Sequence, residues 1–228
     1  MPVTRVCVLS SGVNSHVHAL SQRQDALRDK WRVCVESNTD SLRGGTGDAL
    51  RAADVCIAFS QPGPGTIRPA WVKGMADDAI VFPCANPVPE IWPWEAKEAG
   101  ARVVGTGRSD FPHQLDNSMG FPAIFRGTLD VRERTVTDQM CLEAARGLAR
   151  CAEDKGIHEE CVVPNMDEWE VFPREAVAVG MKAQEEGAAR LEVGREELYA
   201  QACQTIRAAR ERVQFLMNQN LIAPMPGL

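Results

Sequence analysis

The hydrophobic and polar positions of the chain follow one pattern up to about residue 106 and another beyond it. In the first part, short apolar runs alternate with short helix-favouring segments. The apolar runs predict strands at residues 3–9, 55–59, 80–84 and 103–106. The segments between them predict helices at residues 19–31, 48–53, 70–75 and 94–100, and residues 32–36 fit either a strand or a longer first helix. Such alternation is typical of βαβ units and of a parallel sheet with helices on both faces.

Beyond residue 110 the apolar spacing becomes helical. Thr135 and Asp138 resemble a capping box, which predicts a helix that ends near Asp154. Two further helices are predicted at residues 173–189 and 196–217. The last one carries an apolar stripe at spacings of three and four: Leu198, Ala202, Ile206, Ala209, Val213 and Leu216. This stripe either packs on its own domain or forms a seam between subunits. The expected fold class is α/β with a helical C-terminal region.

The composition narrows the class of protein. The chain has 228 residues, 44% hydrophobic residues and a net charge of −6, which suits one or two globular domains and argues against a broad nucleic-acid or anionic-membrane surface. No apolar run approaches the roughly 20 residues that span a bilayer, and the N-terminus lacks the regions of a signal peptide. The eight cysteines form no C-x-x-C pair, so the zinc signature is absent. We expect free thiols in a reducing cytoplasm.

Three loops carry the candidate chemistry. They follow predicted strands, at residues 59–65, 84–90 and 105–112, and are rich in glycine and proline. In open parallel sheets, ligands bind outside the carboxyl ends of the strands, where these loops lie. Asn86, in the second loop, offers a hydrogen-bond donor and acceptors that suit a hydroxy acid or an amide. Asn117 could do the same from the start of a helix.

Three segments together resemble bacterial-type malic enzymes: DVCIAFSQPGPG, IVFPCANPVPEIWPWEAKEAGARVVGTGRSDFPHQLDNSMGFPAIFRGTLDVR and DEWEVFPREAVAVGMKA. The resemblance covers roughly residues 10–190. Malic enzymes oxidise malate with NAD or NADP and decarboxylate the product to pyruvate, aided by Mg²⁺ or Mn²⁺. The resemblance implies a Rossmann-like, partial parallel sheet with flanking helices. It also implies an NAD(P)-binding domain at residues 1–190, followed by a C-terminal helix and tail at residues 191–228.

The resemblance also implies a site. The positions that match cofactor-contacting residues of the family are Ser60, Pro62, Gly63 and Asn86. Asn86 also matches an asparagine that lies at the substrate, and Asn117 matches one of a pair of asparagines whose amides contact malate. The other member of that pair is Asp116 here, and an acid beside a dicarboxylate repels it unless it is protonated or turned away.

The family's dinucleotide fingerprint is not found where it should stand. No G-x-G-x-x-G follows the first predicted strand. The segment VCVLSSG aligns with the family's second strand, and Leu9 then replaces the acid that holds the adenosine ribose. On this alignment the central first strand is missing, so either another polypeptide supplies it or the sheet rearranges. A third interpretation makes residues 3–9 the first strand and residues 32–36 the second, with Glu36 as its acid.

The family's N-terminal domain, with its catalytic tyrosine, general-base lysine and metal ligands, also has no counterpart. We therefore assign no catalytic residue and no metal ligand. The leading hypothesis is an NAD(P)-dependent, malic-enzyme-like oxidoreductase component that needs residues from another chain or segment, with Mg²⁺ or Mn²⁺ only where these are supplied. The alternative is a catalytically inactive structural or regulatory subunit. We expect malate as substrate and a homo-oligomer or a complex as the assembly, without nucleic acid or membrane as partners.

Overall fold

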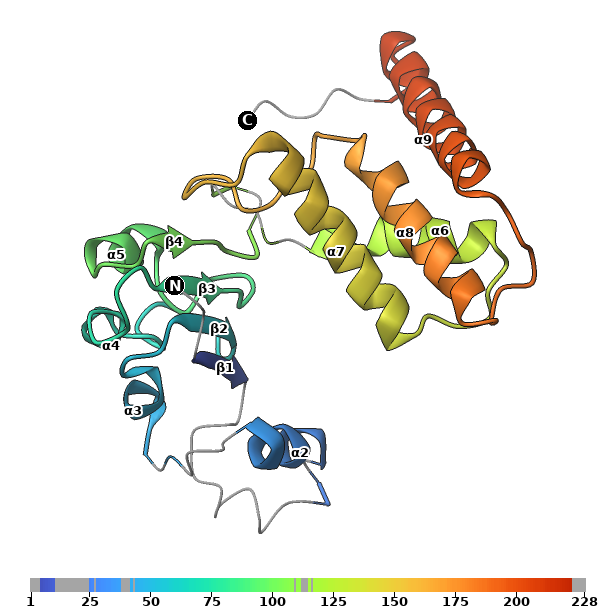
Figure 1. The fold of residues 1–228 in the computed structure, drawn as a ribbon. Coiled ribbons are helices and arrows are strands. Elements are labelled where there is room, and N and C mark those ends of the chain that lie inside the picture. Colours follow the sequence, from blue (N-terminus) through green and yellow to red (C-terminus); the bar gives the residue numbers. More distant parts are fainter. Residues whose placement is uncertain are drawn as a thin grey trace. The chain divides into compact units, whose positions relative to one another are not determined.

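The computed structural model describes residues 5–10, 25–26, 28–37, 42, 44–108, 110–111, 115 and 117–222. The chain divides into two compact units, Met1–Asp116 and Asn117–Leu228. The first unit holds the parallel sheet and the second is a bundle of helices (Figure 1). We expected a boundary between residues 190 and 191 instead. The compact units reflect packing, as in the contacts of the C-terminal helix with other helices of the second unit, and the functional division stays a prediction.

The first unit is built on four parallel strands in the order β1-β2-β3-β4. The strands are β1 (Val6–Ser10), β2 (Val55–Phe59), β3 (Ile80–Pro83) and β4 (Val103–Val104). Val6 lies opposite Val55 and the pairing continues for five residues, so β1 lies directly beside β2. The sequence analysis left two possibilities for the missing strand: another polypeptide supplies it, or the sheet rearranges. The described sheet corresponds to the second, because no gap for a further strand separates β1 from β2.

In the described part of this unit, four helices connect the strands. They are α2 (Arg28–Ser37), α3 (Thr46–Leu50), α4 (Pro69–Val72) and α5 (Pro93–Glu98). The last three confirm predicted helices, and most of the predicted helix at residues 19–31 lies outside the described residues. The interpretation of residues 32–36 as a second strand is wrong, because they belong to α2. Strand residues such as Cys56 and Val81 form a core with Leu50 and Ile91, all 0% exposed.

The second unit consists of a 3₁₀ turn and four α-helices. They are η1 (Asn117–Met119), α6 (Phe121–Asp130), α7 (Asp138–Lys155), α8 (Val171–Glu185) and α9 (Arg195–Asn218). α8 packs against α6, α7 and α9, so it is the central helix of the unit (Figure 1). Its core includes Met140, Val179 and Leu198. The parallel sheet with flanking helices and the helical C-terminal region confirm the predicted α/β fold class.

Two details of the helices differ from the sequence predictions. The N-cap of α7 is Thr137 rather than Thr135, since the Thr137 side chain accepts a hydrogen bond from the Met140 backbone N–H at 3.2 Å. The apolar stripe of α9 is buried only at its beginning, at Leu198 and Ala202, whereas Val213 is 50% exposed. Among the described residues, no helix has the length and apolar character needed to cross a membrane.

Candidate functional site

The predicted ligand-binding edge of the sheet is held together by one buried carboxyl group. Glu90, 0% exposed, follows β3 in the chain. Its Oε1 atom accepts hydrogen bonds from the Ser60 backbone N–H at 2.7 Å and from the Ser60 hydroxyl at 2.9 Å. Its Oε2 atom accepts one from the Ala85 N–H at 3.1 Å. Glu90 thus fastens the loop after β2 to the loop after β3.

Backbone hydrogen bonds strengthen the same connection. The Gly63 N–H donates to the Val88 carbonyl at 3.2 Å, and the Ile67 N–H donates to the Glu90 carbonyl at 3.0 Å. Gly63 has a φ of +121°, in the region that favours glycine, and a Cβ built on it would meet no atom within 4 Å. The backbone at Gly63 is therefore open on the side where a side chain would stand, and a ligand can approach it closely.

The loop after β4 contacts the loop after β3 at Asn86. A Cβ at Gly107 would lie 3.2 Å from the Cys84 carbonyl oxygen and 3.7 Å from the Asn86 amide nitrogen, so only glycine lets the two loops approach this closely. The Asn86 side chain is itself exposed, and the Asn86–Pro87 peptide bond is cis. The amide of Asn86 therefore lies where the loops after β3 and β4 approach each other.

Arg108 fixes the shape of the third loop. Its guanidinium donates to the Pro87 carbonyl at 2.9 Å and, through two nitrogens, to both carboxylate oxygens of Asp110 at 2.7 and 2.6 Å. The hydrogen bond from Arg108 holds the pKa of Asp110 below its usual value. The guanidinium carbon of Arg108 also lies 5.3 Å from the centroid of the Phe111 ring. The positive charge of Arg108 is thus already neutralised by Asp110.

The cysteines near this edge are unsuited to nucleophilic chemistry. Burial, together with the nearby charge of Glu90, raises the pKa of Cys84 to about 11. Burial likewise raises the pKa of Cys56 to about 12. Because the thiolate is the nucleophile, these protonated thiols serve as small apolar groups. Among the described residues, no group of three or more His, Cys, Asp or Glu side chains could hold a metal ion.

The structure brings four of the five predicted site residues to one edge of the sheet. Ser60 and Gly63 are half-buried, whereas Pro62 and Asn86 are exposed. Asn117 belongs to the other compact unit, where it begins η1 with an exposed side chain. Asp116 lies outside the described residues, as does the turn after β1.

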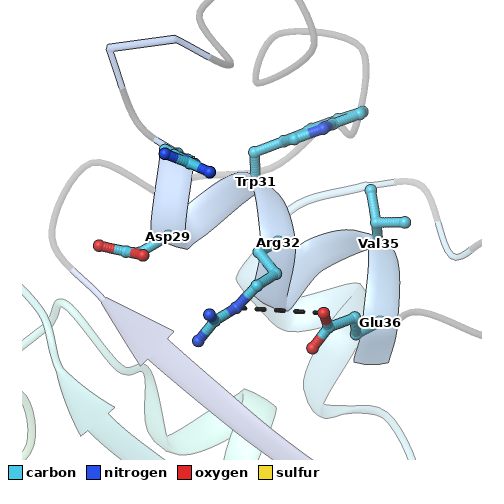
Figure 2. A pocket seen from close by; sticks show the side chains of 6 residues that line it. Asp29, Trp31, Arg32, Val35 and Glu36 are labelled. Carbon is cyan, nitrogen blue, oxygen red and sulfur yellow. Dashed lines mark ion pairs between the residues drawn. The ribbon is translucent and has the colours of Figure 1, made fainter.

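A hollow of about 590 Å³ over α2 is a poor alternative candidate. All of its lining residues come from this one helix: Arg28, Asp29, Trp31, Arg32, Val35 and Glu36. Figure 2 shows the side chains of Arg32 and Glu36 pointing toward each other. The Nε atom of Arg32 lies 4.0 Å from the Oε1 atom of Glu36. Both side chains are about two thirds exposed, and such pairs contribute little stability. None of the predicted site residues lines this hollow.

Two buried acids were missed by the sequence analysis. Glu90 lies between Pro89 and Ile91 at the end of the ANPVPE segment, so a charged residue inside an apolar run was the available signal. Glu175 lies in α8 and is also 0% exposed. Neither of its carboxyl oxygens has a hydrogen-bond partner among the described residues, and burial raises its pKa to about 9.

Comparisons with known proteins identify relatives of the chain. Residues 100–184 match the family model described as "Malic enzyme, NAD binding domain". The bifunctional malic/malolactic enzyme of Bacillus subtilis is 41% identical over 177 residues, which are 77% of this chain and 43% of that protein. The NAD-dependent malic enzyme of Geobacillus stearothermophilus is 42% identical, over 80% of this chain and 39% of that protein. The chain is homologous to malic enzymes over about four fifths of its length.

Solved structures of malic enzymes share its fold. The crystal structure of the Entamoeba histolytica malic enzyme matches with a TM-score of 0.86 and 42% identity, over 96% of this chain and 44% of that one. The malic enzyme of Pyrococcus horikoshii matches with a TM-score of 0.75 and 47% identity, over 80% of this chain and 42% of that one. This malic enzyme homologue spans about 40% of the length of the curated relatives that it matches.

Proposed function

We propose that the chain is the nucleotide-binding component of a malic enzyme, which converts malate to pyruvate by NAD(P)-dependent oxidative decarboxylation. The observation that carries this proposal is the set of three loops at the carboxyl ends of β2, β3 and β4, of which the first two are fastened by Glu90. Ligands of open parallel sheets bind at such an edge. The nicotinamide supplies the hydride acceptor when it is bound.

The residues at this edge fit a nicotinamide cofactor. Ser60, Pro62 and Gly63 form a loop whose backbone is open at Gly63, so the dinucleotide can pass along it. The exposed amide of Asn86 can donate to and accept from a carboxamide or a hydroxyl group. Asn117 is proposed as a second amide that contacts the substrate. Relatives of this chain include both NAD-dependent and NADP-dependent malic enzymes.

The proposed role of these amides is to orient the substrate and the cofactor. Asn86 would hold the nicotinamide and malate at the edge of the sheet so that C2 of malate faces the hydride acceptor. The general base, the acid and the ligands of Mg²⁺ or Mn²⁺ would come from another chain or segment, since the described residues hold no three-ligand cluster. We accordingly propose a homo-oligomer or a complex in the cytoplasm, and we expect no malate turnover by this chain alone.

Calorimetric titration of the full chain with NAD⁺, and then with NADP⁺, tests the proposal. We expect one saturable site, and we expect Asn86→Ala to weaken binding about tenfold because a hydrogen-bonded amide is lost. Asn165→Ala is the matched control, since it removes an exposed amide from the other compact unit. Absence of binding to the folded protein, or equal weakening by the two variants, would refute this site.

A catalytically inactive structural or regulatory subunit is the second candidate. The observation that favours it is the missing G-x-G-x-x-G after the first strand, because this motif normally cradles the pyrophosphate. Under this alternative, neither nucleotide binds and Asn86→Ala is silent. Changes in the exposed half of α9, such as Val213→Glu, would instead abolish assembly with a partner.

A further inference from the structure

The helical unit contains a cavity with an unusual concentration of arginine. The cavity has a volume of about 400 Å³ and is lined by Arg150 of α7, Arg174 of α8 and Arg195 of α9. The remaining lining residues are Gly147, Val177, Ala178, Glu196 and Tyr199. Its volume falls within the range of about 300–1,000 Å³ that is typical of small-molecule sites. All of these residues belong to one compact unit, so the cavity is formed within that unit.

The charge of this cavity is opposite in sign to that of the whole protein. Three guanidinium groups line it against a single carboxylate, Glu196, whereas the chain has a net charge of −6. Arg174 is paired with Asp154 outside the lining. Within the part of the chain that the structure describes, Arg150 and Arg195 have no ion pair. Two cationic groups therefore remain available to a ligand.

The beginning of α9 adds to this positive potential. The helix is 24 residues long and starts at Arg195, after Gly194 as N-cap. Its first backbone bond runs from the Leu198 N–H to the Gly194 carbonyl, so the preceding N–H groups of the first turn have no acceptor within the helix. These N–H groups carry the positive end of the helix dipole. Arg195 and Glu196 belong to this turn and also line the cavity.

The cavity also offers an apolar wall. Val177 and Ala178 of α8 supply this surface. The hydroxyl of Tyr199, which also lines the cavity, is engaged with Cys203, and this hydrogen bond, together with burial, raises the pKa of Tyr199 above its usual value. A ligand with charged oxygens can therefore rest a small apolar body on Val177 and Ala178.

We propose that this cavity binds a small multivalent oxyanion, that is, a compound with several phosphate or carboxylate groups. Arg150 and Arg195 contact its charged oxygens, Arg174 lies beside them, and its remaining body rests on Val177 and Ala178. Guanidinium groups are suited to this role because their planar array of N–H donors matches two oxygens at once. This binding site is additional to the proposed nucleotide site on the sheet.

Calorimetric titration of the full chain with inorganic pyrophosphate and, separately, with citrate tests the proposal. We expect one saturable site for at least one probe, with affinity that falls as salt is added. Saturation by pyrophosphate alone identifies a phosphate ligand, and saturation by citrate alone identifies a carboxylate ligand. Binding of neither probe to the folded protein overturns the proposal.

Variants separate this cavity from any other anion site. Arg150→Gln and Arg195→Gln should each weaken binding about tenfold, whereas Glu196→Gln should strengthen it. Arg212→Gln is the matched control, since Arg212 lies on the same helix 17 residues, or roughly 25 Å, beyond Arg195. Equal weakening by Arg195→Gln and Arg212→Gln refutes the site, as does an unchanged affinity in the Arg150 and Arg195 variants. The affinity of the same variants for NAD⁺ should be unchanged. The proposal of the oxyanion site and the proposal of the nucleotide site can therefore be refuted independently.

Discussion

Glu175 makes the stability of the helical unit depend on pH. Its side chain is fully buried in α8, and both carboxyl oxygens have no hydrogen-bond partner among the described residues. Burial raises its pKa from 4.5 to about 9. Glu175 is therefore protonated in the folded protein at neutral pH but ionised in the unfolded chain. Between about pH 4.5 and pH 9 the unfolded state binds fewer protons than the folded state, so stability falls as the pH rises.

The magnitude follows from the shift of the pKa. Each pH unit in this window lowers the free energy of unfolding by about 1.4 kcal/mol, which amounts to about 3 kcal/mol at pH 7 relative to acid conditions. Glu175→Gln removes the ionisation while keeping the size of the side chain. Any cost of burying the amide is the same at every pH, so the predicted signature is a slope rather than an offset. From pH 5 to pH 8 the variant should gain about 4 kcal/mol relative to the unsubstituted protein.

Urea unfolding followed by far-ultraviolet circular dichroism at pH 5, 6, 7 and 8 measures this slope, because the signal reports mainly on helices. Glu192→Gln is the matched control, since it removes an exposed carboxylate from the same compact unit and should leave the slope unchanged. Parallel pH curves for Glu175→Gln and the unsubstituted protein would show that Glu175 is ionised in the folded state, and the argument from its burial would be wrong.

Two further predictions concern packing and the loops of the sheet. Gly127→Ala should lower the free energy of unfolding in urea by about 2 kcal/mol, because the new Cβ would stand 2.3 Å from the Ala176 carbonyl oxygen. Gly147→Ala is its control: the new Cβ would lie 3.4 Å or more from its neighbours, so this variant should be neutral or slightly stabilising. Glu90→Gln should lower the free energy of unfolding by about 1–3 kcal/mol and weaken any nucleotide binding, since an amide NH₂ would face a backbone N–H. Glu98→Gln, at an exposed position, is its control and should change neither stability nor binding.

The strands and most helices could be predicted because their apolar spacing is set by local geometry. The segment around Val33 and Val35 is the exception in the first unit, since it alternates like a strand but forms α2 with both side chains about half exposed. A helix over Phe121–Asp130 was also not placed, because its large apolar residues, such as Phe125, point outward. In both cases exposure is decided by neighbouring elements rather than by the local pattern.

The candidate site shows the same limit. The position of Asn86 and Gly63 in loops after strands could be predicted from short motifs, and their roles at the site stay predictions. The role of Glu90 could not, because its partner Ser60 lies 30 residues away in the chain. Glu175 was missed for a related reason, since nothing in its sequence surroundings marks a carboxyl group that is buried without a partner.

The attachment of two loops to one side chain restricts how these loops can change. Ser60 and Ala85 share Glu90 as their acceptor, so an alteration of any one of these positions affects both loops. A new loop grafted after β2 must keep a residue with a backbone N–H, and preferably a hydroxyl, at position 60, because both donate to a carboxyl group that belongs to the loop after β3. For protein engineering, the two loops and Glu90 therefore form a single cassette.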